Sequence, residues 1–204
     1  MNLLDMMREV AKNAGIEQPS SIDSADANHV LMVQFLNDAG DEIERRADWG
    51  VLRQTETIFG TGSPNNFALP EEYARMSPGL AVTFGALPVR GSLTPDEWMS
   101  LAPVAGDPRY FYLTGKRISF YPYLRSSATA QVLFQSSFWA ESDVGPQASM
   151  IIAEDRSRVP SELVVSGAVW RWRRHVGKDF ADYVAEFEAT LAALAASDGG
   201  VRAP

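Results

Sequence analysis

Residues 159–194 read VPSELVVSGAVWRWRRHVGKDFADYVAEFEATLAAL, and this stretch predicts two helices joined by a tight corner. The first helix should begin near Pro160, because a first helical turn tolerates the missing amide. It should end at Gly177, which can adopt the left-handed conformation that stops a helix. Cationic side chains crowd the last turn before Gly177, where they suit the negative pole of the helix dipole.

The first of these helices has two apolar faces instead of one. At about 100° per residue, two stripes lie on nearly opposite sides. One consists of Leu163, Gly167 and Trp170, and the other of Val165, Val169, Trp172 and Val176. Such a helix needs cover on both sides. Gly167 costs about 1 kcal/mol of helix propensity relative to alanine, so we expect another backbone to approach closely there.

Three further helices are predicted from apolar spacing. The second helix of the corner has a single stripe: Phe180, Tyr183, Val184, Phe187, Leu191 and Leu194. Near the amino terminus, one amphipathic helix should run from Leu3 to Ala14 and end at Gly15. Another should run from an N-cap at Ser24 or Asp26 to about Asp48.

After Leu52 the apolar period becomes that of extended chain. The strongest signal is RYFYLTGKRISFYPY at 109–123, in which two alternating aromatic and aliphatic runs flank a Thr-Gly-Lys turn. This pattern predicts a β-hairpin. A long strand is expected over 128–139, whereas 143–158 mixes glycine, proline and charge and is predicted to be mostly loop.

This order of elements predicts an α+β fold. We expect an antiparallel bundle of about four helices, built from residues 1–52 and 159–197. A β-rich insertion lobe, residues 53–158, should lie between the second and third long helices. Residues 198–204 are expected to form a flexible tail.

The composition excludes several classes of protein. The chain has 204 residues, of which 46% are hydrophobic, so it can bury a sizeable core. Its net charge of −8 argues against a surface that grips nucleic acid throughout. The absence of cysteine excludes disulfides and thiolate metal sites, and two histidines cannot form a multi-histidine centre. Without a leader or a long apolar run, the sequence predicts a protein made and kept in the cytoplasm.

No catalytic motif is found. The sequence has no nucleophile elbow, phosphate-binding loop, dinucleotide-binding glycine pattern, zinc pattern or calcium loop. The acidic positions Asp38, Asp41, Glu42 and Glu44 resemble a carboxylate set, but we expect them to be solvated on a helix surface. His29 and His175 are expected at a surface or a helix end. The chain is therefore predicted to be no enzyme, with no catalytic, cofactor-binding or metal-binding residues.

Two features are candidates for binding. The aromatic residues of the hairpin could form a sugar-stacking platform, although alternating aromatics are ordinary strand residues and a role in the core is favoured. They are Tyr110, Phe111, Tyr112, Phe120, Tyr121 and Tyr123. The second feature is the cluster WRWRRH, which could bind phosphate or an acidic protein surface. Dipole complementation with local salt bridges explains this cluster equally well.

In their order along the chain and in the kinds of residue that they contain, four segments resemble those of the head-to-tail adaptor (connector) proteins of tailed bacteriophages. The segments are FLNDAGDEIERRADWGVLRQTETI at 35–58, LPEEYARM at 69–76, YFYLTGKRISFYP at 110–122 and VPSELVVSGAVWRWRRHVGKDFADYVAEFEATL at 159–191. The resemblance covers nearly the whole chain. The fold it implies, a helical bundle with a β insertion, agrees with the pattern of elements.

The resemblance implies a structural virion protein at the head-to-tail junction, made in the host bacterial cytoplasm. It implies a ring, usually of twelve subunits, beneath the portal, which extends the DNA channel and docks tail components. The expected partners are other copies of the chain, the portal protein, tail or nozzle proteins, and double-stranded DNA that passes without specific recognition; no membrane and no cofactor are expected. The predicted subunit or portal interface consists of Trp170, Arg171, Trp172, Arg173 and Arg174.

Two rival functions stay open at this point. One is a carbohydrate-binding or other tail-associated module that uses the aromatic hairpin. The other is an enzyme whose site is dispersed in the sequence, which requires a deep pocket lined by carboxylates with shifted pKa values.

Overall fold

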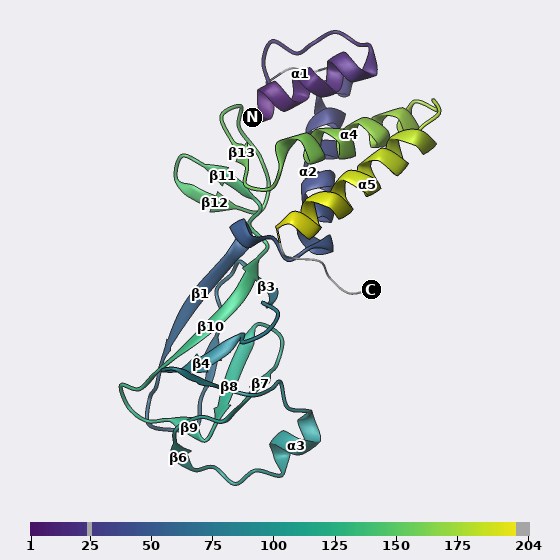
Figure 1. Ribbon diagram of the computed structural model, residues 1–204. Coiled ribbons are helices and arrows are strands. Elements are labelled where there is room, and N and C mark those ends of the chain that lie inside the picture. The colour runs from purple at the N-terminus through teal and green to yellow at the C-terminus, as the bar shows by residue number, and fades with distance from the viewer. Residues whose placement is uncertain (24–25, 199–204) are drawn as a thin grey trace. The chain divides into compact units, whose positions relative to one another are not determined.

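The computed structural model describes residues 1–23 and 26–198, and the chain divides into two units (Figure 1). Unit 1 comprises Met1–Leu52 and Ser137–Pro204, and unit 2 comprises Arg53–Ser136. Each unit has its own hydrophobic core. Unit 1 contains the helices α1 (Leu3–Ala14), α2 (Ala27–Arg46), α4 (Ser161–His175) and α5 (Ala181–Ser197), and the short 3₁₀ turn Gly50–Leu52.

Local capping sets the limits of the first two helices. The Asn2 side chain accepts a 2.8 Å hydrogen bond from the Asp5 N–H at the start of α1. Gly15, with φ of 71°, ends α1 as its sequence position predicts. At the start of α2, the Asp26 carboxylate accepts a 2.8 Å hydrogen bond from the Asn28 N–H.

The corner between α4 and α5 is confirmed. α4 begins immediately after Pro160, and Gly177 adopts a φ of 70° beyond its last turn. The Gly177 N–H bonds to the Arg174 carbonyl at 3.2 Å, and the Lys178 N–H bonds to the Arg173 carbonyl at 2.9 Å. These two bonds satisfy carbonyls that the helix end leaves without an intrahelical donor.

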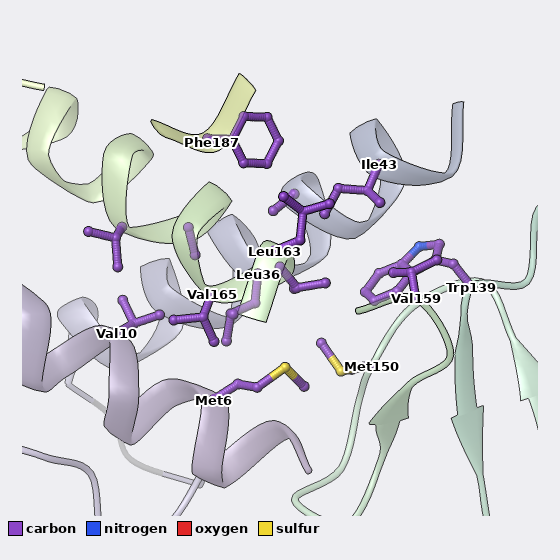
Figure 2. Close-up of a cluster of buried hydrophobic side chains, with 14 of the residues drawn as sticks. Met6, Val10, Leu36, Ile43, Trp139, Met150, Val159, Leu163, Val165 and Phe187 are labelled. Carbon is purple, nitrogen blue, oxygen red and sulfur yellow. The ribbon is translucent and has the colours of Figure 1, made fainter. Parts of the chain in front are cut away.

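Helix α4 lies at the centre of unit 1, where it contacts α1, α2 and α5 (Figure 1). Within α4, the residues of both predicted apolar faces are buried except Trp170, which is half-buried, and the cover comes from the same chain; Val176, just beyond the helix, is exposed. Figure 2 shows Val165 of α4 facing Val10 of α1, and Leu163 of α4 close to Leu36 of α2. Phe187 of α5 covers the same helix from another side (Figure 2).

Two glycines allow the tight packing in unit 1. A Cβ at Gly167 would lie 2.8 Å from the Ala39 Cβ, so α2 makes the close approach that this glycine predicts. A Cβ at Gly40 would lie 2.3 Å from the ring of Trp139, a fully buried residue. The Trp139 indole N–H also donates a 2.7 Å hydrogen bond to the Asp41 carboxylate, which fixes the ring against α2.

Unit 1 also contains a small antiparallel sheet in the order β12-β11-β13. Its strands are β11 (Ala140–Ser142), β12 (Gly145–Gln147) and β13 (Arg156–Ser157). The Asp155 carboxylate holds the connecting segment, since it accepts hydrogen bonds from the Gln147 side chain and from the N–H groups of Ile151 and Ile152 at 2.6–2.9 Å. The segment predicted as loop is therefore ordered partly by one carboxylate, which closes the turn at residues 151–155 and ties it to the end of β12.

Unit 2 is built mainly from antiparallel strands. One sheet has the order β1 (Arg53–Phe59), β10 (Thr129–Ser136), β4 (Val82–Phe84), β5 (Leu87–Pro88), and β3 (Tyr73–Met76) also pairs with β10. A second has the order β2 (Asn66–Ala68), β8 (Arg117–Tyr121), β7 (Tyr110–Leu113). The short strands β6 (Ala105–Gly106) and β9 (Tyr123–Leu124) pair in parallel, and helix α3 spans Pro95–Met99.

The predicted hairpin is confirmed. β7 and β8 pair with Phe111 opposite Phe120, and both rings are buried in the core of unit 2. Alternation also sets the inner face of β10, where Ala130, Val132 and Phe134 are buried.

The predicted fold class is partly wrong. The α+β description holds, but the described residues contain five α-helices and several antiparallel sheets, not a four-helix bundle with one β insertion. The three strands within residues 140–157 pack in the helical unit. Unit 2 therefore ends at Ser136, whereas we placed the end of the lobe after Arg158. Within the predicted tail, residues 199–204 lie outside the described residues.

Replacement of Gly40 by alanine tests the contact with Trp139. The added methyl group displaces a ring that is hydrogen-bonded to Asp41, so Gly40→Ala should lower the free energy of unfolding by about 1–3 kcal/mol. The higher helix propensity of alanine acts in the opposite direction by about 1 kcal/mol. Urea unfolding measures the difference, with Ala185→Leu on the exposed face of α5 as control. Equal or higher stability of Gly40→Ala would contradict the packing described.

Candidate functional site

The described residues show no site for metal chemistry. Within residues 1–23 and 26–198, no group of three or more histidine, cysteine, aspartate or glutamate side chains could hold a metal ion. In the same ranges, no helix combines the length and apolar character needed to cross a bilayer. The His175 ring packs 5.9 Å from Phe35 and 6.2 Å from Trp172, between ring centroids, at the end of α4.

The carboxylates of α2 have structural partners. Asp41 accepts the hydrogen bond from Trp139 described above. Glu42 forms a salt bridge with Arg46 at 3.0 Å and another with Arg171 of α4. Glu44 is buried. Asp41 thus fixes Trp139 and Glu42 joins α2 to α4, so these two carboxylates are not free for general acid–base catalysis, and Asp38 is exposed on the surface of α2.

A chain of charges connects three helices of unit 1. Arg171 of α4 pairs with Glu42 of α2, and Arg46 of α2 pairs with both Glu42 and Glu188 of α5. The Arg46 guanidinium donates two hydrogen bonds to Glu188, at 2.6 and 2.5 Å. These bonds raise the pKa of Arg46 against the opposing effect of desolvation, and they lower the pKa of Glu188. The pairs set the relative positions of α2, α4 and α5 at their surface.

Four of the five predicted interface residues make contacts inside the chain, and three of them pack within the helical unit. Trp172 is only 3% exposed, and its ring meets Phe35 edge-on with centroids 6.5 Å apart. Trp170 is half-buried beside Phe187. Arg171 lies over the Trp170 ring at 4.3 Å and donates a 2.8 Å hydrogen bond to the Gly167 carbonyl. Trp172 is consequently unavailable to a partner, because the core of its own monomer already surrounds it.

Arg173 and Arg174 lie at an exposed turn, residues 173–180, which we name the basic corner. The Arg173 guanidinium stacks on the Tyr183 ring at 4.2 Å, and its Nε–H donates to the Asp179 carbonyl at 2.6 Å. Arg174 and Lys178 are exposed and form no ion pair within the part of the chain that the structure describes. The basic corner thus presents two cations that no carboxylate of the described residues neutralises.

A groove of about 640 Å³ lies between α1, α4 and α5, and we name it the acidic groove. Val165 and Val169 form an apolar floor, and Glu9, Glu162 and Glu186 supply carboxylates. The remaining lining residues are Met1, Asn13, Ser161, Ser166 and Tyr183. This groove is not predictable from the sequence, because its residues come from three helices whose packing the spacing of apolar residues does not determine.

The aromatic residues of the hairpin separate into two groups. Phe111 and Phe120 are buried in the core, whereas Tyr112 stacks on Trp98 of α3 with centroids 5.4 Å apart and planes 18° apart. Tyr121 and Tyr123 line an open groove of about 440 Å³ together with Trp98. We name it the aromatic groove; no charged side chain lines it.

The negative charge is concentrated in unit 1. This unit holds 20 of the 26 acidic residues and 11 of the 18 basic residues of the chain. Unit 1 therefore has a net charge of −9 and unit 2 one of +1, which together give the −8 of the chain.

Comparison with known proteins adds evidence that is independent of this geometry. The family model described as "SU10 adaptor protein" matches residues 1–204, which is the full length of the chain. Among curated proteins, the comparison found no match.

Removal of the Trp172 side chain should destabilise the monomer. Trp172→Ala leaves a large cavity in the core of unit 1 and should lower the free energy of unfolding by about 3–5 kcal/mol. Arg174→Ala removes an exposed side chain and should change it by less than about 0.5 kcal/mol. Urea unfolding followed by circular dichroism measures both. Wild-type stability of Trp172→Ala would show that the tryptophan is not part of the core.

The pair between Arg46 and Glu188 should make stability depend on pH. The Arg46 hydrogen bonds lower the folded-state pKa of Glu188 below its ordinary value of 4.5. The stabilisation is therefore present above the unfolded-state pKa and is lost as the pH falls through the folded-state pKa. We expect Glu188→Gln to be slightly less stable than the wild type at pH 7, since the pair is partly exposed, and the difference to disappear in acid.

Urea unfolding between pH 7 and pH 3 measures this dependence. Glu17→Gln is the control, because Glu17 is exposed and forms no ion pair within the described ranges. A difference between Glu188→Gln and the wild type that stays constant over this pH range would contradict the assignment.

Proposed function

The chain belongs to the SU10 adaptor protein family, a family of phage head-to-tail adaptors, and from this premise we propose that it forms a closed ring beneath the portal of a phage. The resemblance found in the sequence is thereby confirmed at the level of the family. Family membership also makes the protein a structural component of the virion. The ring, its twelve copies and its contact with the portal are parts of the proposal.

The family match over the full length carries this proposal. The exposed surface of unit 1 supports it, because the basic corner is a specific cationic surface without carboxylate partners in the described part of its own chain. A subunit that contacts its neighbour through two different surfaces forms a head-to-tail interface, and such an interface closes into a ring when the rotation per subunit divides a full turn. The mechanism is assembly, with no chemical turnover.

The charge distribution supports a passive role toward DNA. A surface that binds many phosphates releases counterions and holds DNA tightly. Unit 1 carries a large excess of carboxylates, so a channel lined by it would repel the phosphate backbone and let the duplex slide. We therefore propose that double-stranded DNA passes through the ring without specific recognition.

In the proposed assembly, the protein lies between the portal and the tail. We propose that the portal protein and tail or nozzle proteins are its partners in the virion, after synthesis in the host cytoplasm. The family is one of structural adaptors, and this role requires no catalytic centre.

A carbohydrate-binding module is the second candidate function. One observation favours it: Trp98, Tyr121 and Tyr123 line a neutral groove, and aromatic faces stack on sugar rings. The amide of Asn66 contributes a buried carbonyl oxygen with no hydrogen-bond partner in the described part of the chain. We rank this candidate second, because the family match assigns the protein to virion assembly and gives no indication of a glycan.

The native mass of the purified chain tests the proposed ring. Native mass spectrometry of the chain, alone and mixed with the portal protein of the same phage, should show an assembly of about a dozen copies in at least one of the two conditions. Electron microscopy of the assembly should show a ring with a central channel. A chain that stays monomeric in both conditions would refute ring formation.

A further inference from the structure

We infer that the acidic groove of one copy binds the basic corner of the next copy in the ring. This inference rests on the proposed function, since it names the two surfaces through which the subunits would meet. Both surfaces belong to unit 1 and involve α4: Glu162, Val165 and Val169 of this helix line the groove, and its carboxyl end leads into the corner.

Charge complementarity identifies the occupant of the groove. Glu162 and Glu186 are exposed and have no ion-pair partner within the described ranges of the chain. At the basic corner, Arg174 and Lys178 are likewise exposed and unpaired within those ranges. Two sets of unneutralised charges of opposite sign therefore occur on one folded unit, and each can neutralise the other across a subunit interface.

The groove also contains positive charges and the corner a negative one. These reduce the difference in charge between the two surfaces without removing it. Lys12 bonds to Glu9 at 3.1 Å, and the amino-terminal ammonium lies 3.5 Å from the Ser161 hydroxyl oxygen. At the corner, the Asp179 carboxylate accepts a 3.2 Å hydrogen bond from the Ala181 N–H at the start of α5. Glu162, Glu186, Arg174 and Lys178 carry the complementarity that the inference uses.

Apolar surface accompanies the charges on both sides. In the groove, Val165 and Val169 of the floor are only 6% and 4% exposed, and the exposed apolar surface comes mainly from the ring of Tyr183, which is 37% exposed. Beside the cations of the corner, Val176 is 43% exposed and Phe180 is 36% exposed. Burial of these side chains in the groove would add a hydrophobic contribution, as at the centres of protein interfaces, where charged groups surround an apolar contact.

Within one copy, the basic corner cannot reach Glu162 at the far end of the acidic groove. Glu162 lies in the first turn of α4 and Arg174 in its last turn. Twelve residues of helix separate them, which at 1.5 Å per residue is about 18 Å along a rigid rod. The corner of the same chain is therefore held away from Glu162. At the other end of the groove the two surfaces adjoin, because Arg173 of the corner stacks on Tyr183, which lines the groove. A second copy can bring its own corner to Glu162. Since groove and corner are different surfaces, the contact is head-to-tail and leaves one free surface of each kind until a ring closes.

Charge reversal of each surface tests the inference. The groove variant is Glu162→Lys with Glu186→Lys, and the corner variant is Arg174→Glu with Lys178→Glu. All four side chains are exposed, so both variants should fold, which circular dichroism and thermal unfolding check. Each variant alone places like charges in contact and should weaken assembly about tenfold or more, measured by native mass spectrometry under the condition in which the wild type forms its ring.

Recovery of assembly when complementary variants are combined distinguishes direct pairing of the two surfaces from a general effect of net charge. When the groove variant and the corner variant are mixed, every junction regains opposite charges, so rings that alternate the two chains should form. The chain with all four substitutions should form rings by itself. The control Glu17→Lys with Glu154→Lys changes the net charge of the chain as much as the groove variant does, at exposed positions outside both surfaces, and should assemble like the wild type.

Three outcomes would overturn the inference. Assembly of both single-surface variants like the wild type would exclude the two surfaces as the interface and leave the proposed ring intact. Loss of assembly without restoration, in the mixture or in the fourfold variant, would exclude their direct pairing. Loss of portal binding by the groove variant with normal rings would assign the groove to a cationic segment of the portal protein. Absence of rings in the wild type in both conditions would instead refute the proposed function.

Discussion

The packing of α4 on both of its faces is the constraint on which unit 1 depends. Burial of one valine, leucine or methionine side chain stabilises a fold by about 1.5–3 kcal/mol, and α4 contributes such side chains to contacts with α1, α2 and α5. This cover requires α2 to come closer than an ordinary side chain at position 167 allows. Gly167 and Ala39 provide the necessary space, and Gly40 provides it for Trp139 on the same helix. The close packing of α2 against α4 therefore depends on the absence of a side chain at position 167.

The same packing determines what is left for assembly. Other helices of the same chain cover both apolar stripes of α4, so neither stripe remains as a large exposed patch. Arg171 is also used internally, since it closes the chain of charges through Glu42 to Arg46. The surfaces that remain available on α4 are polar and border on smaller apolar areas. Recognition between copies then depends on the positions of a few charges, which gives specificity more than strength.

The sequence allowed local features to be predicted better than the contacts between elements. Pro160 and Gly177 mark the ends of α4, because proline and glycine restrict or free the backbone irrespective of what packs around it. The alternation of residues 110–121 likewise revealed the hairpin. The small sheet at 140–157 was missed, since its order depends on the Asp155 carboxylate, which joins N–H groups that no periodic pattern marks. Trp172 is predicted at an interface but lies in the core of unit 1. Two apolar stripes indicate that a helix is covered on two sides, but they do not indicate whether its own chain or another molecule provides the cover.

The acidic balance has a consequence for the order of assembly. Copies whose helical units carry a large negative charge repel one another, but the repulsion between exposed charges is screened beyond about 8 Å at physiological ionic strength. The proposed contact between corner and groove acts within that distance and is opposed by the entropy that two subunits lose on association. A template that already holds the copies side by side removes much of this entropic cost. If the proposed portal contact provides this template, short-range attraction combined with a general negative charge would keep the subunits apart in solution and let them join on the portal.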